Sequence, residues 1–135
     1  MLSGIHPILT GLLLAYLDEM GHSDGIVIAD AHFPAARVAR RLVVLPALDA
    51  PMVLAAIRTV IPLDDDPALD LMQSLRVGVE PVQVELLSAA ELHQGRARFL
   101  DRYSFYEAAQ SAFLVIRTGE TRTYGNVLLR KGLVT

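Results

Sequence analysis

The chain has 135 residues and a net charge of −3, from 12 lysines and arginines against 15 aspartates and glutamates. This length suits one domain, residues 1–135, whose core needs no covalent cross-links. The sequence has no cysteine, which excludes disulfides, thiolate metal sites and thiol nucleophiles.

The basic residues are dispersed, apart from Arg37, Arg40 and Arg41, which we interpret as a solvated helix face. Because nothing resembles a phosphate-binding stripe, no nucleic-acid partner is expected. The N-terminus lacks the pattern of a secretory signal, and no apolar run approaches membrane-spanning length. We therefore expect a cytoplasmic protein that has no membrane partner.

Hydrophobic residues make up 53% of the chain. A small domain has a large surface for its volume and needs polar groups to cover that surface. The excess predicts that apolar surface is buried between copies of the chain in a symmetric homo-oligomer. A core that is unusually rich in apolar residues is the alternative.

The first half of the chain alternates helix and strand patterns. Thr10 can cap a helix that runs to about residue 20, where Gly21 can end it. The continuous apolar runs Gly25–Ala29 and Leu42–Leu45 predict two short strands covered on both faces. Asp49 caps a predicted helix to about residue 60.

The second half is read in the same way. Residues 63–69 form a loop, residues 71–77 are compatible with a strand, and Pro81 opens a helix to about residue 93. Residues 94–101 show no clear pattern. Ser104 can cap a helix to about residue 110, and residues 112–116 and 127–129 predict two more strands. The alternation indicates an α/β domain.

Polar residues follow or precede several of these strands. Asp30 directly follows the first strand, and Tyr124-Gly125-Asn126 precedes the last one. Open α/β sheets bind ligands at strand ends, so these positions are candidates for a site. His22 lies before the first strand, which spans roughly 17 Å. His22 and Asp30 can meet only if the connection folds back or if they face each other across a subunit boundary.

Each candidate has a functional and an ordinary interpretation. His22 can act as a general acid or base, or it can bond a loop carbonyl. Asp30 can hold sugar hydroxyls or orient a histidine, or it can cap a turn. Arg102 can fork onto sugar oxygens, or it can pair with Asp101 or Glu107 on the surface.

The sequence offers no signature for a metal or cofactor. His22, Asp30 and His32 are not spaced as in a recognised zinc motif. There is no glycine-rich phosphate loop and no nucleophile elbow. Tyr124-Gly125-Asn126 supplies a phenol and an amide that suit polyol recognition, although it is also ordinary turn composition.

Several ordered motifs together resemble the ribose pyranase/L-fucose mutarotase family over nearly the whole chain. They are Gly4-Ile5-His6-Pro7, Glu19-Met20-Gly21-His22-Ser23-Asp24, Ile28-Ala29-Asp30-Ala31-His32-Phe33-Pro34-Ala35, Phe105-Tyr106-Glu107-Ala108-Ala109-Gln110, Thr118-Gly119-Glu120 and Tyr124-Gly125-Asn126-Val127-Leu128-Leu129-Arg130-Lys131-Gly132. The resemblance is closer to the fucose branch, because the ribose branch lacks His32 and typically has Ala in place of Gly125. Residues 63–99 match poorly.

The resemblance implies a three-layer α/β/α domain with a largely parallel sheet, assembled into ring-shaped oligomers, commonly decamers, with sites between subunits. It implies His22 as the general acid and places a second set of residues at the sugar: Asp30, Arg102, Tyr124, Gly125 and Asn126. His32 and Tyr106 are implied as neighbours. The implied activity is interconversion of the anomers of a deoxy-hexose such as L-fucose, without a cofactor. A ribose-type pyranase and a non-catalytic sugar-binding protein are the alternatives.

Overall fold

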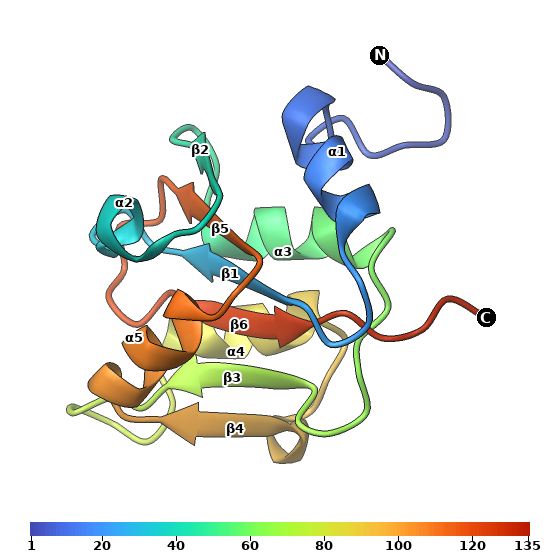
Figure 1. Cartoon of the computed structure of the whole chain (residues 1–135). Helices are drawn as coiled ribbons and strands as arrows, with labels where there is room; N and C mark the ends of the chain where they lie inside the picture. Colours follow the sequence, from blue (N-terminus) through green and yellow to red (C-terminus); the bar gives the residue numbers. More distant parts are fainter.

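A computed structural model describes all residues, 1–135, and shows six strands in one sheet with the order β2-β5-β1-β6-β3-β4 (Figure 1). The strands are β1 (Gly25–Ala29), β2 (Leu42–Leu45), β3 (Leu69–Met72), β4 (Ala97–Leu100), β5 (Leu114–Thr118) and β6 (Val127–Arg130). β6 runs antiparallel to both of its neighbours, and the other pairings are parallel. The predicted mostly parallel sheet is confirmed.

Five α-helices and one 3-10 helix accompany the strands, with α1 before β1 and the others in the connections between strands. They are α1 (Gly11–Glu19), α2 (Ala35–Val38), α3 (Ala50–Arg58), α4 (Pro81–Ala89), η1 (Gln94–Arg96) and α5 (Arg102–Gln110). None of the helices combines the length and the apolar character needed to span a bilayer.

The two faces of the sheet carry separate cores, as the alternation of side chains along β1 shows. Ile26 and Ile28 pack into a cluster of 21 buried residues with α1, α3 and α4. Val27 and Ala29 point the other way, into a cluster of 11 buried residues with α2 and α5. In Figure 1, α2 and α5 lie in front of the sheet and α3 and α4 behind it. The domain is therefore three-layered, with helices on both faces.

Local sequence accounts for α3 and β1. The Asp49 carboxylate accepts a hydrogen bond from the backbone N–H of Met52 at 2.9 Å, which caps α3 as predicted. All five residues of β1 are buried, so the strand is covered on both faces as predicted. Thr10 stands at the N-cap of α1, but its side chain makes no capping bond, so that detail of the prediction is wrong.

Three predicted strands need correction. β2 is at the edge of the sheet and only partly buried, so the prediction of cover on both faces is wrong. Residues 71–77 do not form a strand, because the ladder with β4 and β6 covers Leu69–Met72 only. β5 begins at Leu114, two residues later than predicted, where pairing with β1 starts.

Two helix boundaries also differ from the predictions. α5 begins at Arg102 rather than after Ser104, because the Asp101 carboxylate accepts hydrogen bonds from both the backbone N–H and the hydroxyl of Ser104. α4 ends at Ala89, and Glu91 then takes a positive φ of 59°, which breaks the helix. The structure thus starts α5 next to the end of β4.

Candidate functional site

A hollow of about 360 Å³ opens at the edge of the sheet where the five parallel strands end and β6 begins. The hollow is lined by Asp30, His32, Phe33, Met72, Arg76, Arg102, Tyr106, Thr123, Tyr124 and Asn126. Six of these residues are candidates from the sequence: Asp30, His32, Arg102, Tyr106, Tyr124 and Asn126. The fold therefore brings together residues that lie up to 96 positions apart in the chain.

Asp30 and Asn126 are fixed to each other in the hollow. The Asp30 backbone N–H donates to Asn126 Oδ1 at 2.8 Å, and Asn126 Nδ2 donates to Asp30 Oδ2 at 3.0 Å. The His32 backbone N–H donates to Asp30 Oδ1 at 3.0 Å. Asp30 is only 4% exposed and Asn126 3%. Every bond of the carboxylate comes from a neutral donor, and no cation pairs with it.

Burial raises the pKa of Asp30 above its ordinary value of 3.8, while the hydrogen bonds from His32 and Asn126 oppose the rise. A carboxyl group with a raised pKa is a better proton acceptor than an ordinary aspartate. Asp30 therefore combines a fixed geometry with the chemistry of a general base.

The turn before β6 presents Tyr124 to the hollow. Tyr124 has a positive φ of 67°, and its hydroxyl oxygen accepts a hydrogen bond from the backbone N–H of Leu75 at 3.1 Å. Gly125 does not line the hollow. A Cβ at Gly125 would lie 2.8 Å from Glu120 Cγ and 3.1 Å from the Arg122 carbonyl oxygen, so only glycine fits there. Gly125 thus lets the turn pack closely behind the site.

Arg102 is the first residue of α5, which places its guanidinium at the mouth of the hollow. Nη2 donates to the Tyr103 hydroxyl at 3.1 Å, and no carboxylate lies within ion-pair distance. The alternative of a surface pair with Asp101 or Glu107 is therefore wrong. Arg102 keeps most of its N–H donors for a ligand.

Aromatic rings form the apolar wall of the hollow. Tyr106 and Phe33 pack edge to face with ring centroids 5.4 Å apart, and Phe33 packs in the same way on the buried Phe105. Apolar walls with a few fixed polar groups are typical of small-molecule sites. The wall suits the apolar C–H face of a sugar or a methyl substituent.

Four lining residues were not predicted: Phe33, Met72, Arg76 and Thr123. Phe33 lies inside one of the motifs quoted above, and Thr123 directly precedes Tyr124. Both could have been predicted at the site because they are next to candidate residues in the sequence. Arg76 lies in residues 73–79, a loop that overlaps the stretch predicted as a strand, residues 71–77. Long-range contacts with Thr123 and Tyr124 bring this loop to the hollow.

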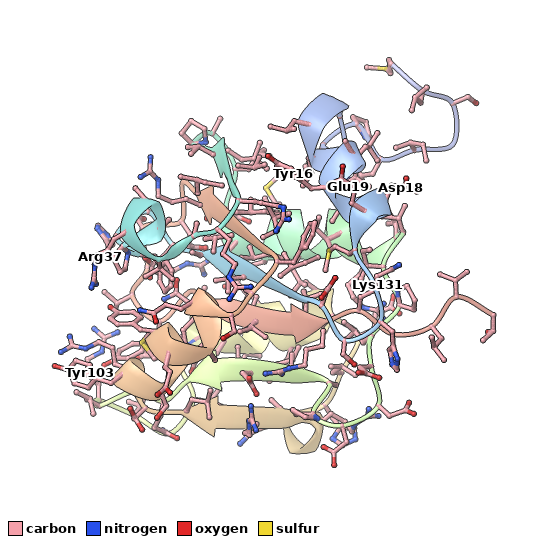
Figure 2. The ribbon with its side chains drawn as sticks, viewed as in Figure 1. Tyr16, Asp18, Glu19, Arg37, Tyr103 and Lys131 are labelled. Carbon is pink, nitrogen blue, oxygen red and sulfur yellow. The ribbon has the colours of Figure 1, made fainter.

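His22 lies at the opposite end of β1 from Asp30. Its Nε2 is 3.2 Å from Asp64 Oδ1, and the Ser23 backbone N–H donates to the carbonyl of Lys131. Figure 2 shows Lys131 and Tyr103 at opposite ends of the strands, and Tyr103 contacts Arg102. The connection therefore does not fold back, and the His22 side chain is 51% exposed.

Asp64 holds the side chains of the His22 loop in place. The Ser23 hydroxyl donates to Asp64 Oδ2 at 2.8 Å. This bond and the contact with His22 keep the pKa of Asp64 below its ordinary value. Asp64 is therefore an ionised partner that can orient the imidazole. No three histidine, aspartate or glutamate side chains gather in a way that would hold a metal ion.

Comparison with known proteins places these features in a family. Residues 3–134 match the RbsD / FucU transport protein family. The chain is 36% identical to L-fucose mutarotase of Histophilus somni strain 2336, over 98% of this chain and 97% of that one. It is 38% identical to fucose mutarotase of Danio rerio, over 99% and 95%. The fucose mutarotase of Streptococcus pneumoniae, solved in complex with L-fucose, superposes with a TM-score of 0.88 at 31% identity, over 99% and 100%. The chain belongs to the RbsD / FucU family.

Proposed function

We propose that this protein is a sugar mutarotase that interconverts the α and β anomers of a deoxy-hexose such as L-fucose. The observation that carries the proposal is the hollow lined by buried Asp30, which is bonded to Asn126, by Arg102, which pairs with no carboxylate, and by an aromatic wall. The full-length relatives named fucose mutarotase support the same activity.

The reaction opens the sugar ring and closes it on the other face. One group gives a proton to the ring oxygen while another removes the proton of the anomeric hydroxyl, and the C1–O5 bond breaks to leave the open aldehyde. Rotation about C1–C2 and the reverse proton transfers give the other anomer. A positioned acid or base contributes about 10²–10⁴-fold to the rate of such a step.

The residues divide between proton transfer and binding. Asp30 is the base, because it is the only carboxylate in the hollow and its burial favours proton uptake. Arg102 and Asn126 hold hydroxyls that stay outside the chemistry. Tyr124 and His32 contribute further hydrogen-bonding groups, and Tyr106 lies along the apolar face of the ring.

The acid is His22 of a neighbouring subunit in a ring-shaped homo-oligomer, as in a decamer. The strand β1 separates His22 from Asp30 within one chain by roughly 17 Å. His22 is exposed and backed by the ionised Asp64, so it can face a site on another copy. A cytoplasmic location fits an enzyme that acts on a free monosaccharide.

Exposed apolar side chains support such an assembly. Leu75 is 91% exposed and Leu12 58%, and the edge strand β2 leaves Val44 40% exposed. Isolated exposed apolar residues are ordinary, but a half-buried edge strand is a surface that proteins normally cover. Burial of this surface between copies accounts for the apolar excess of the sequence.

Anomer exchange measured by saturation-transfer NMR tests the activity. With wild-type protein, L-fucose is expected to exchange well above the solvent rate and D-ribose much less. Solvent-rate exchange of both sugars would reject a mutarotase of this type. Faster pyranose–furanose exchange of D-ribose would instead establish the pyranase.

Complementation tests the shared site. His22→Ala and Asp30→Asn each remove one half of the proposed acid/base pair. Mixed oligomers of the two inactive variants contain some sites with both wild-type groups, provided that the groups come from different chains. Recovery of exchange supports the shared site, and continued inactivity in a verified mixed oligomer rejects it.

A further inference from the structure

Arg76 enters the hollow from a loop, residues 73–79, that lies between β3 and α4 and that overlaps the strand wrongly predicted over residues 71–77. Its guanidinium lies 5.4 Å from the centroid of the Tyr124 ring. Nε donates to Glu80 Oε1 at 2.9 Å, and Nη2 donates to Thr123 Oγ1 at 2.7 Å. The side chain is 60% exposed, and two hydrogen bonds hold its guanidinium in place.

The support of Arg76 reaches into the core. Glu80 has a side chain that is only 10% exposed, and its Oε1 also accepts from the Ser74 hydroxyl at 2.8 Å. The backbone N–H of Glu80 donates to the fully buried Gln83, whose Nε2 donates to the Met72 carbonyl at 2.7 Å. The chain of bonds therefore links Arg76 to the end of β3.

Part of the guanidinium remains free for a ligand. Nη1 of Arg76 has no hydrogen-bond partner within the chain, whereas Nε and Nη2 both have one. The Ser74 hydroxyl and Arg76 both keep the pKa of Glu80 below its ordinary value, so Glu80 is ionised and offsets the charge of Arg76. An arginine whose charge is offset is suited to neutral hydroxyls, while its planar fork can contact two adjacent oxygens.

We infer that Arg76 is a second sugar-binding arginine of this site, which contacts neighbouring hydroxyls of a neutral sugar and helps to set which sugar is accepted. A guanidinium stays protonated at all working pH values, so Arg76 binds and does not transfer protons. Glu80 is a positioning residue, because it touches Arg76 and not the hollow. The inference rests on the proposed function of the hollow as a sugar site.

Arg76→Met removes the guanidinium and keeps most of the apolar stem, and Arg76→Lys keeps the charge without the fork. Arg37→Met is the matched control, since Arg37 is an exposed arginine of α2 outside the hollow (Figure 2). Sugar binding is measured by ligand-observed NMR titration, and anomer exchange is measured in the same samples. The sugars are L-fucose and its 2-, 3- and 4-deoxy analogues.

Arg76→Met is expected to raise the Kd and KM for L-fucose roughly tenfold and to change kcat less than threefold, since a hydrogen bond from a charged group is lost. For the deoxy analogue that lacks a hydroxyl contacted by Arg76, Arg76→Met is expected to raise the Kd less than it does for L-fucose. Arg76→Lys is expected to recover only part of the affinity for L-fucose. Arg37→Met matches wild type.

An unchanged Kd in Arg76→Met, or an equal loss for every analogue, overturns the inference in favour of a structural role. Tighter binding of a hexuronate than of L-fucose that depends on Arg76 overturns the assignment to a neutral sugar. The Kd measurement does not depend on catalysis. It therefore decides the role of Arg76 even if wild-type protein leaves anomer exchange at the solvent rate, which is the outcome that rejects the proposed function.

Discussion

Asp30 and Asn126 bond each other twice across the neighbouring strands β1 and β6, with the backbone N–H of Asp30 and the side-chain amide of Asn126 as the two donors. The pair satisfies both polar groups of the Asn126 side chain in a place where water is excluded. It also fixes the one buried carboxylate that faces the hollow.

Asn126→Ala is expected to destabilise the protein by about 1–3 kcal/mol, because it leaves a buried backbone N–H and one oxygen of Asp30 without a partner. Denaturant unfolding measures the change. Anomer exchange of the folded variant is expected to fall as well, since Asp30 loses its orientation. A variant as stable as wild type would show that the pair contributes nothing to the fold.

Gly125→Ala is expected to destabilise the protein by about 1–3 kcal/mol through overpacking against the buried Glu120. Gly78→Ala is the matched control, because a Cβ at Gly78 meets nothing within 4 Å. Thermal unfolding of both variants, with sugar titration, checks the prediction. Equal effects of the two substitutions would contradict the close approach behind the Tyr124 turn.

The pH dependence of stability reports on Asp30. Its folded pKa is above the ordinary value of 3.8, so the folded state binds more protons than the unfolded state in the interval between the two pKa values. The contribution of Asp30 to stability is therefore present below the ordinary pKa and is lost as pH rises through the folded pKa.

Asp30→Asn removes this titration, so the difference in stability between wild type and variant is expected to change across that interval. Titration of the Asp30 carboxyl carbon by NMR measures the folded pKa directly. A titration midpoint at or below 3.8 would refute the assignment of Asp30 as the base.

Asp101 connects the stability of α5 to the position of Arg102. Asp101→Ala removes both bonds to Ser104, so it is expected to lower the melting temperature and to weaken sugar binding through a frayed first turn. Asp101→Asn can still cap the helix and is expected to retain most of the affinity. If the alanine variant binds sugar as wild type does, the cap does not position Arg102.

Local sequence patterns were enough for some elements and not for others. β1 was predicted to the residue because a continuous apolar run is bounded by Gly25 and Asp30. The interpretation of Arg37, Arg40 and Arg41 as one helix face is wrong, because α2 ends at Val38 and four residues are too few to show a helical period. Both Asp101 and Ser104 are good capping residues, and only the bond between them shows that Asp101 takes the cap.

The site also contains residues that the sequence predicts and residues that it does not. Asp30 follows β1 and Asn126 precedes β6, and both were candidates because they stand at strand ends. They meet because β6 runs antiparallel to β1, which no local pattern predicted. The hollow also uses Arg76, whose place depends on contacts with Thr123 and Tyr124, 47 and 48 positions further along the chain. β4 could not be predicted because the charged Arg98 interrupts its apolar pattern. Arg98 donates to the fully buried Asp70 on the adjacent strand β3, a contact that the local sequence does not show.

The most direct test of the proposed activity is saturation-transfer NMR of L-fucose anomer exchange with wild type, His22→Ala and a matched control, His93→Ala. His93 is an exposed histidine outside the lining of the hollow. We predict rapid exchange in wild type and His93→Ala, and a loss of about 10²–10⁴-fold in His22→Ala. Exchange in His22→Ala at the wild-type rate would contradict His22 as the acid, and exchange at the solvent rate in all three proteins would contradict the mutarotase itself.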